Sequence, residues 1–373
     1  MRFSAFVVLA ALLAGCSSAS DPGDVFSRAK LAAAGPMASL PAAQLADDHM
    51  IAADGSTLPL RRWLPQGEPR AVVLALHGFN DYSKAFAGPG AAWTKDGIAT
   101  YAYDQRGFGA APGRGRWPGA KRLTGDAETA AKLLRERYPG IPLYLLGESM
   151  GGAVAILAAS GQGGAPRADV DGVILVAPAV WGRQTMNFAE RIGLWLADLM
   201  PSVRLSPDLI PVRIQPSDNF AMLRAYSADP LVIKDTRADT LQGLVDLMSA
   251  ALVSAASFDA PALLLYGEHD EIVPRRPMAR FVDGLPARAQ LRQRVALYAH
   301  GYHMLLRDLD GPLLIKDVAA WMTDPAAPLP SGADDAARTR LTGHSEPLAA
   351  AIRCSVRATP RGASLASCRF ACP

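Results

Sequence analysis

The sequence predicts an α/β fold in which a mainly parallel, doubly wound sheet forms one large core. Short apolar runs rich in β-branched and aromatic residues alternate with helical stretches through the middle of the chain. This alternation is typical of parallel sheets with helices on both faces. Half of the 373 residues are hydrophobic, which is sufficient for one large domain. A third observation is a serine set between glycines at 147–152, directly after one apolar run.

Six continuous apolar segments are predicted to be buried strands. They are residues 71–76, 99–103, 143–146, 172–176, 262–266 and 294–298. Residues 126–138 and 312–322 are predicted helices, because the first has alanines and leucines spaced to bury one face and the second opens with a proline. Residues 49–53 and 57–64 flank an Asp-Gly pair, which predicts an antiparallel hairpin at the sheet edge.

The alternation breaks between about residues 180 and 257. This stretch has no convincing strand, but it contains amphipathic helical segments at 188–199 and 241–256. Because it lies between two predicted strands, we interpret it as an insertion. Its apolar content predicts a helical cap over a hydrophobic cleft, with side chains such as Leu194 and Trp195 exposed. The alternative is that these helices extend the core.

Ser149 is the candidate nucleophile. It lies in Gly147-Glu148-Ser149-Met150-Gly151-Gly152, between an apolar strand and an apolar helix. Glycines on both sides allow a sharp turn with a strained serine backbone, and the following helix start directs N–H groups toward developing negative charge. The alternative is a glycine-rich strand-to-helix turn in which the serine is incidental.

The backbone N–H groups of Phe79 and Met150 are the candidate oxyanion hole. Phe79 follows His77-Gly78 at the end of the first long apolar strand, and donors aimed at a developing alkoxide each contribute about 10² to 10³ in rate. We expect His77 to support this loop and not to act in catalysis. Asp104 and Arg106 follow the next strand and are likewise expected to organise their loop.

A candidate acid and a candidate base follow the last two predicted strands. Three acidic residues crowd the turn after residues 262–266, and we select Asp270 because it has the shortest side chain and lies just beyond the glycine. A histidine after the last strand would be the general base. His300 and His303 compete for this role.

These motifs in this order resemble the monoglyceride lipase and lysophospholipase branch of the α/β-hydrolase superfamily, the serine aminopeptidase-type hydrolases. The matching motifs lie at 77–83, 104–109, 147–152, 267–274 and 301–303, so the resemblance covers roughly residues 50–322. It implies an α/β-hydrolase fold over about 45–323, a triad of Ser149, Asp270 and His303, and no metal or organic cofactor. Gln105 and Glu148 depart from the family pattern, since histidine is more usual at both positions.

The resemblance implies a serine esterase that acts on fatty-acid esters, with monoacylglycerol or lysophospholipid favoured. Peptide hydrolysis and acyl transfer use the same triad and remain alternatives. A non-catalytic lipid-binding lipoprotein is an alternative of another class. The net charge of +3, with interspersed signs, gives no reason to expect a nucleic-acid partner.

The first residues are interpreted as a lipoprotein signal, 1–16. A positive charge and an apolar run precede Leu-Ala-Gly-Cys, which resembles a bacterial lipobox ending at Cys16. The resemblance implies lipidation of Cys16 and attachment to the cell envelope, with the outer membrane favoured because no aspartate follows the cysteine. We expect residues 17–44 to form a tether. The alternative is an ordinary secretory signal.

The last segment, 324–373, is predicted to be a disordered tail because it is rich in Ala, Pro, Arg and Ser without periodicity. Contact of this basic tail with anionic lipid is an open alternative. It contains Cys354, Cys368 and Cys372, which lack metal-ligand spacing, and His344 does not complete a site with them.

Overall fold

The computed structural model describes residues 41–206 and 214–343. The central sheet has nine strands in the order β1-β2-β3-β5-β4-β6-β7-β10-β11. Their bounds are β1 (Gln44–Leu45), β2 (His49–Ile51), β3 (Thr57–Trp63), β4 (Ala71–Leu76), β5 (Ile98–Tyr103), β6 (Leu143–Glu148), β7 (Gly172–Val176), β10 (Ala262–Gly267) and β11 (Gln293–Tyr298). The strands from β5 to β11 in this order pair in parallel, and β1, β2 and β3 add an antiparallel edge. The predicted fold class is confirmed.

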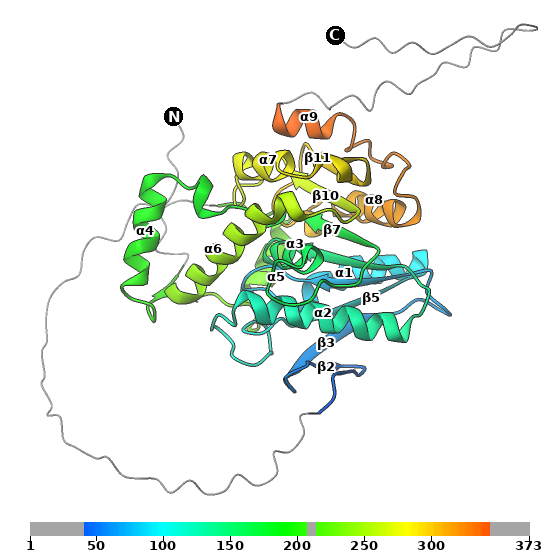
Figure 1. Cartoon of the computed structure of the whole chain (residues 1–373), viewed down its shortest axis with the longest axis horizontal. Coiled ribbons are helices and arrows are strands. Elements are labelled where there is room, and N and C mark those ends of the chain that lie inside the picture. The colour runs from blue at the N-terminus through cyan, green and yellow to red at the C-terminus, as the bar shows by residue number, and fades with distance from the viewer. Residues whose placement is uncertain (1–40, 207–213, 344–373) are drawn as a thin grey trace, which may run out of the picture.

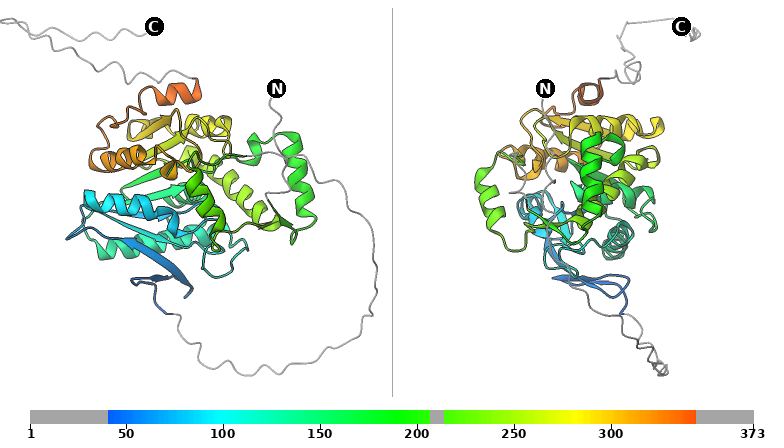
Figure 2. Two further views of the ribbon diagram at one scale, coloured as in Figure 1. Left: turned by 180° about the vertical axis from the view of Figure 1, so that it is seen from behind. Right: turned by 90° about the vertical axis from the view of Figure 1, so that its left-hand side faces the viewer.

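The sheet lies between two layers of helices. Along β4, Val72, Leu74 and Leu76 join one core cluster while Val73 and Ala75 join the other, as expected for alternating side chains of a strand buried on both faces. The first cluster lies under α2 (Ala120–Arg137), α3 (Met150–Ser160), α6 (Ala238–Val253) and α7 (Arg275–Asp283). The second lies under α1 (Ala87–Trp93) and α8 (Gly311–Thr323). Figure 1 is seen from the α2 and α3 side, and the left view of Figure 2 from the α1 and α8 side.

The register of the strands brings their carboxyl ends to one edge. Leu76 of β4 is opposite Gly147 of β6, and Gly267 of β10 is opposite Tyr298 of β11. The loops after β4, β6, β10 and β11 therefore all begin at this edge. It is the edge at which open α/β sheets bind ligands.

Between β7 and β10 the chain leaves the sheet and forms α4 (Phe188–Asp198), β8 (Arg204–Leu205), α5 (Phe220–Ala228), β9 (Thr236–Arg237) and α6. The expectation that this stretch has no strand is wrong, since β8 and β9 pair over two residues. So short a pair has no sequence pattern of its own and forms only because the fold brings its strands together. The helix α5 was also not expected.

The helices of this insertion differ in how they pack. A capping box starts α4, in which Asn187 and Glu190 each accept a hydrogen bond from the other's backbone N–H. Figures 1 and 2 show α4 standing out beside α6. Trp195 is exposed as expected, but Leu194 is buried, because it lies one turn after the buried Glu190 on the face of α4 that packs inward.

The helix α6 packs against the main core, with Leu247 and Ala251 almost fully buried. The stretch Ala238–Ser257 is apolar and long enough to cross a membrane by length and composition alone, but half of it is buried in the fold. The helix α6 therefore extends the core, as the alternative interpretation of the insertion holds, whereas α4 is the part of the insertion that projects.

The disordered tail predicted from residue 324 is wrong for residues 324–343. Leu329 and Leu341 are buried, and Arg294 of β11 pairs with Asp334 at 2.5 Å. The backbone N–H of Leu297 donates to Ala333 O at 2.9 Å, so this segment covers the free edge of β11 before α9 (Ala337–Thr342) begins. The lipobox with Cys16, most of the tether, His344 and the three late cysteines lie outside the described residues.

Candidate active site

Ser149 lies at the turn between β6 and α3 in a strained backbone conformation, with φ 53° and ψ −115°. The backbone holds it from two directions: its N–H donates to Val176 O and its carbonyl accepts from the Ala179 N–H, both at 2.9 Å. The serine is partly exposed at the carboxyl edge of the sheet. This is the predicted strand-to-helix elbow.

Three glycines make the elbow possible because the backbone on either side packs too closely for a side chain. A Cβ on Gly147 would overlap Gly151 O, and a Cβ on Gly151 would overlap Leu76 O. A Cβ on Gly152 would lie 2.8 Å from Pro178 Cβ. The glycines therefore set how closely the α3 helix approaches the sheet.

The loop after β4 runs beside the serine. A Cβ on Gly78 would lie 3.4 Å from Ser149 Cβ, so the backbone that leads to Phe79 passes next to the nucleophile. Met150 is the first residue of α3, where backbone N–H groups have no partner within the helix. The structure thus places the backbone that leads to Phe79 and the first residue of α3 beside Ser149.

This loop is anchored to the insertion through Asn80, which has a positive φ of 63°. Its side-chain amide donates to Thr236 Oγ1 at 2.6 Å, and its carbonyl accepts from the Ile233 N–H at 2.9 Å. The position of the candidate oxyanion donor Phe79 therefore depends on contacts with the cap.

Asp270 and His303 face one another. His303 Nδ1 lies 2.9 Å from Asp270 Oδ2, and both side chains are almost fully buried. The other two acids of the turn point elsewhere: Glu268 pairs with Arg340 at 3.0 Å, and Glu271 accepts from the Gln215 N–H at 2.9 Å. Among these acids Asp270 is the partner of His303, as selected from the sequence.

The proton affinity of His303 follows from its surroundings. Burial favours the neutral imidazole, but the charge of Asp270 and its hydrogen bond outweigh burial and raise the pKa of His303 above its usual value. Glu148 raises this pKa further, and Arg307 lowers it. His300, by contrast, is exposed.

His77 supports its loop, as expected. Its Nδ1 donates to Gly78 O at 2.8 Å, its Nε2 accepts from the Gln105 N–H at 2.9 Å, and burial lowers its pKa. Both ring nitrogens of a neutral imidazole are therefore used. The Gln105 side chain donates to His77 O at 2.8 Å, which gives this departure from the family pattern a structural role.

Asp104 and Arg106 also organise loops. Asp104 accepts from the backbone and hydroxyl of Ser83 and from the Ala110 N–H. Arg106 is nearly buried between Asp126 at 2.6 Å and Asp54 at 2.7 Å, so it ties α2 to the β2–β3 hairpin.

Several residues at this edge were missed by the sequence analysis. Arg307 pairs with Glu148 at 2.7 Å and with Asp81 at 2.8 Å, and Asp308 accepts from the Ser217 hydroxyl at 2.6 Å. The only sequence signal was Glu148 itself, an unexpected charge beside the nucleophile. Its partner is 159 positions away, and no local pattern links the two.

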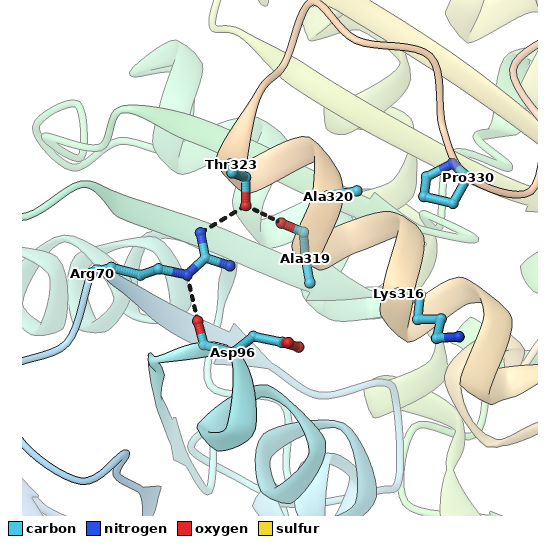
Figure 3. Close-up of a pocket in the computed structure, with 7 residues that line it drawn as sticks. All are labelled: Arg70, Asp96, Lys316, Ala319, Ala320, Thr323 and Pro330. Carbon is cyan, nitrogen blue, oxygen red and sulfur yellow. Dashed lines mark hydrogen bonds between the residues drawn. The ribbon is translucent and has the colours of Figure 1, made fainter.

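A hollow of about 410 Å³ on the described surface lies away from this site (Figure 3). Arg70, at the start of β4, crosses it and donates to Thr323 Oγ1 at 2.6 Å and to Asp96 O. These residues lie at the amino ends of the strands, at the edge opposite Ser149. Within 41–206 and 214–343, no group of three His, Cys, Asp or Glu side chains is placed to hold a metal ion.

Comparison with known proteins agrees with this geometry. A family model described as "Serine aminopeptidase, S33" matches residues 67–310, more than half of the chain and all of the motifs above. The chain belongs to this family. As a member of the S33 family it is a serine hydrolase built on the α/β-hydrolase fold.

The chain is also similar to two relatives and to one solved structure. It is 24% identical to an uncharacterized abhydrolase domain-containing protein of Dictyostelium discoideum over 74% of this chain, but it spans only 29% of that relative's length. It is 25% identical to a monoacylglycerol lipase of Mycolicibacterium smegmatis over 70% of this chain and 90% of the relative. A soluble variant of monoglyceride lipase from Saccharomyces cerevisiae shares the fold, with a TM-score of 0.63, 22% identity, and coverage of 79% of this chain and 99% of that one.

Proposed function

We propose that this S33-family hydrolase cleaves carboxylic esters of fatty acids, with monoacylglycerol or lysophospholipid as substrate, through an acyl-enzyme on Ser149. The observation that carries the proposal is the buried Asp270–His303 pair at the same sheet edge as the strained Ser149. The name of the Mycolicibacterium relative, a monoacylglycerol lipase, supports the substrate class.

The proposed reaction has two steps. His303 takes the Ser149 proton as Oγ attacks the ester carbonyl, and the N–H groups of Phe79 and Met150 stabilise the resulting oxyanion. The imidazolium, stabilised by Asp270, then protonates the leaving alcohol. Water, activated by the same histidine, releases the fatty acid from Ser149 and restores the enzyme.

The outer face of α4 supports the proposal that the substrate is amphiphilic. Phe188, Ile192, Trp195 and Leu199 are exposed by 79%, 41%, 60% and 61%. Their spacing of three or four residues places them on one side of the helix. A large apolar face on the projecting part of the cap is suited to meeting a lipid aggregate.

We further propose that the chain is lipidated at Cys16 and held at the bacterial cell envelope, with the outer membrane favoured. The lipobox-like sequence before Cys16 is the support for this proposal. Anchoring would keep the enzyme beside a membrane that contains its substrates.

Labelling with a fluorophosphonate tests the function. We expect covalent modification of Ser149 in the wild type and none in Ser149→Ala, together with hydrolysis of acyl-glycerols or lysophospholipids. Labelling of Ser149 together with activity only on aminoacyl amides would favour a peptidase. Transfer of the acyl group to an alcohol would favour an acyltransferase. Lipid binding without labelling would favour a non-catalytic lipoprotein.

A further inference from the structure

Arg307 is a buried cation in the loop that carries the candidate base. It lies four residues after His303, and its side chain is 12% exposed. Its Nη1 lies 2.8 Å from Asp81 Oδ2, and its Nη2 lies 2.7 Å from Glu148 Oε1. The ring of Tyr226 from α5 covers the guanidinium, with the Arg307 Cζ 5.7 Å from the ring centroid. The reaction proposed above does not use this cluster.

The cluster joins the three loops that the reaction needs. Asp81 lies two residues after Phe79, and its N–H donates to Gly78 O at 3.3 Å. Glu148 directly precedes Ser149. A single planar guanidinium, which can bind two carboxylates in fixed directions, therefore links the oxyanion loop, the nucleophile and the base loop.

The charges of the cluster also act on His303. The charged groups that face this histidine are Asp270, Glu148 and Arg307, and those that face Arg307 are Asp81 and Glu148. The Tyr226 phenol also faces Arg307, but it is neutral because burial raises its pKa. Two carboxylates surround one guanidinium, so removing one of the negative charges or the positive charge changes the electrostatic potential at the imidazole. Glu148 Oε2, Asp81 Oδ2 and Arg307 Nε are buried without a hydrogen-bond partner among the described residues. Arg307 therefore donates a hydrogen bond to Glu148 and holds Asp81 as an ion pair at 2.8 Å.

We propose that Arg307, held between Asp81 and Glu148, is a positioning residue of the hydrolytic reaction, which sets the spacing of the three loops and offsets the charge of Glu148 beside His303. This inference rests on the proposed function. It also gives Glu148, the second departure from the family pattern, a role in the site.

The test measures kcat, KM and the pH profile of kcat/KM on a short soluble ester for Arg307→Lys, Arg307→Met and Glu148→Gln. Arg307→Met should lower kcat by about 10²-fold with KM changed by less than about threefold, because the groups that react are misplaced. Arg307→Lys should also lower kcat, since an ammonium cannot hold two carboxylates in the same fork.

The pH profile separates positioning from simple support of the fold. Glu148→Gln removes a negative charge near His303, so the acidic limb should move to lower pH by about half a unit or more. Arg307→Lys keeps the positive charge, so its acidic limb should stay at the wild-type pH. Arg307→Met should move the limb upward or leave it in place, because protonation of the unpaired Glu148 would compensate part of the lost charge.

Asp126→Asn is the matched control, since it breaks the buried Arg106–Asp126 pair away from the site. It should lower the melting temperature without moving the acidic limb. The inference is overturned if Glu148→Gln leaves the limb in place or moves it upward, or if Arg307→Lys retains the wild-type kcat. If Arg307→Met fails to fold, Glu148→Gln and Arg307→Lys still decide the result.

The proposed function is checked separately with Ser149→Ala. Hydrolysis that survives in Ser149→Ala would contradict the proposed function itself. Hydrolysis that depends on Ser149, with pH limbs that do not respond to Glu148→Gln, would contradict only the role of Arg307.

Discussion

Asp270 divides its two carboxylate oxygens between the backbone and His303. Its Oδ1 accepts from the N–H groups of Ile272 and Val273 at 2.8 and 2.9 Å, and its Oδ2 faces His303 Nδ1 at 2.9 Å. The backbone contacts fix the carboxylate, and the carboxylate fixes the imidazole with its proton on Nδ1. Nε2 is then the nitrogen that can accept a proton.

Substitution of the triad should remove turnover without unfolding the protein. Ser149→Ala and His303→Ala are each expected to lower kcat by about 10⁴-fold or more. His300→Ala should have a mild effect, because His300 is exposed and Asp270 faces His303. Steady-state kinetics with circular dichroism as a folding check would measure this. An inactive His300→Ala would show that the base is assigned to the wrong histidine.

Activity should fall at low pH, and the acidic limb of the pH–rate profile should lie above the usual imidazole pKa of about 6.5. His303 must be neutral to take a proton, and its pKa is raised because the charge of Asp270 outweighs burial. Rate is therefore lost as the pH drops through this raised pKa. In Asp270→Asn the limb should move to lower pH, and kcat should fall by about 10⁴-fold because the amide favours the wrong tautomer. An acidic limb of the wild type at or below the usual imidazole value of about 6.5 would contradict the prediction.

Gly151→Ala should destabilise the fold by about 2 kcal/mol or more, because the added methyl group overlaps Leu76 O and neither backbone can move freely. Gly193→Ala is the matched control, since a Cβ at this α4 position meets nothing within 4 Å. Alanine there should stabilise the protein by about 0.5–1 kcal/mol through its higher helix propensity. Thermal denaturation would measure both, and equal effects would mean that the elbow tolerates a side chain.

The apolar face of α4 should matter for long acyl chains more than for short ones. Ile192→Ser and Trp195→Ser are expected to weaken turnover of long-chain esters far more than of acetyl esters, because each buried methylene contributes about 0.8 kcal/mol. Leu313→Ser is the matched control, since Leu313 on α8 has the same 41% exposure as Ile192 but lies outside the cap. Equal losses on both substrates would show that the cap supports the fold and does not contact the acyl chain.

Cys16→Ser should release the protein from the membrane fraction. Acyl chains on this cysteine would supply about 0.8 kcal/mol per buried methylene and so would dominate attachment. Fractionation of cells with immunoblotting would measure this. Membrane association that persists in Cys16→Ser would mean that the cap or the basic terminal segment is the anchor.

Local patterns in the sequence were sufficient for the parallel strands, the elbow and the loops that follow the strands. The segments 71–76 and 172–176 are strands with the predicted bounds, because a continuous apolar run bounded by turn residues can be buried on both faces only inside a parallel sheet. Ser149 could be singled out for a similar reason. The glycines that the sharp turn requires lie within five residues of Ser149, so the short sequence around the serine is enough to predict the turn.

The contacts between distant segments could not be predicted from local patterns. Two of them are the pairing of Arg307 with Glu148 and Asp81 and the packing of residues 324–343 along β11. The different packing of α4 and α6 within the insertion also follows from the folded structure. Such contacts follow no periodicity or local spacing in the sequence. Their stabilising energy comes from burial and from charge pairs, and the buried surroundings exist only once the sheet has folded. Local patterns are therefore enough to predict the fold class and the candidate reacting groups, whereas the folded structure is needed to find which charges surround those groups.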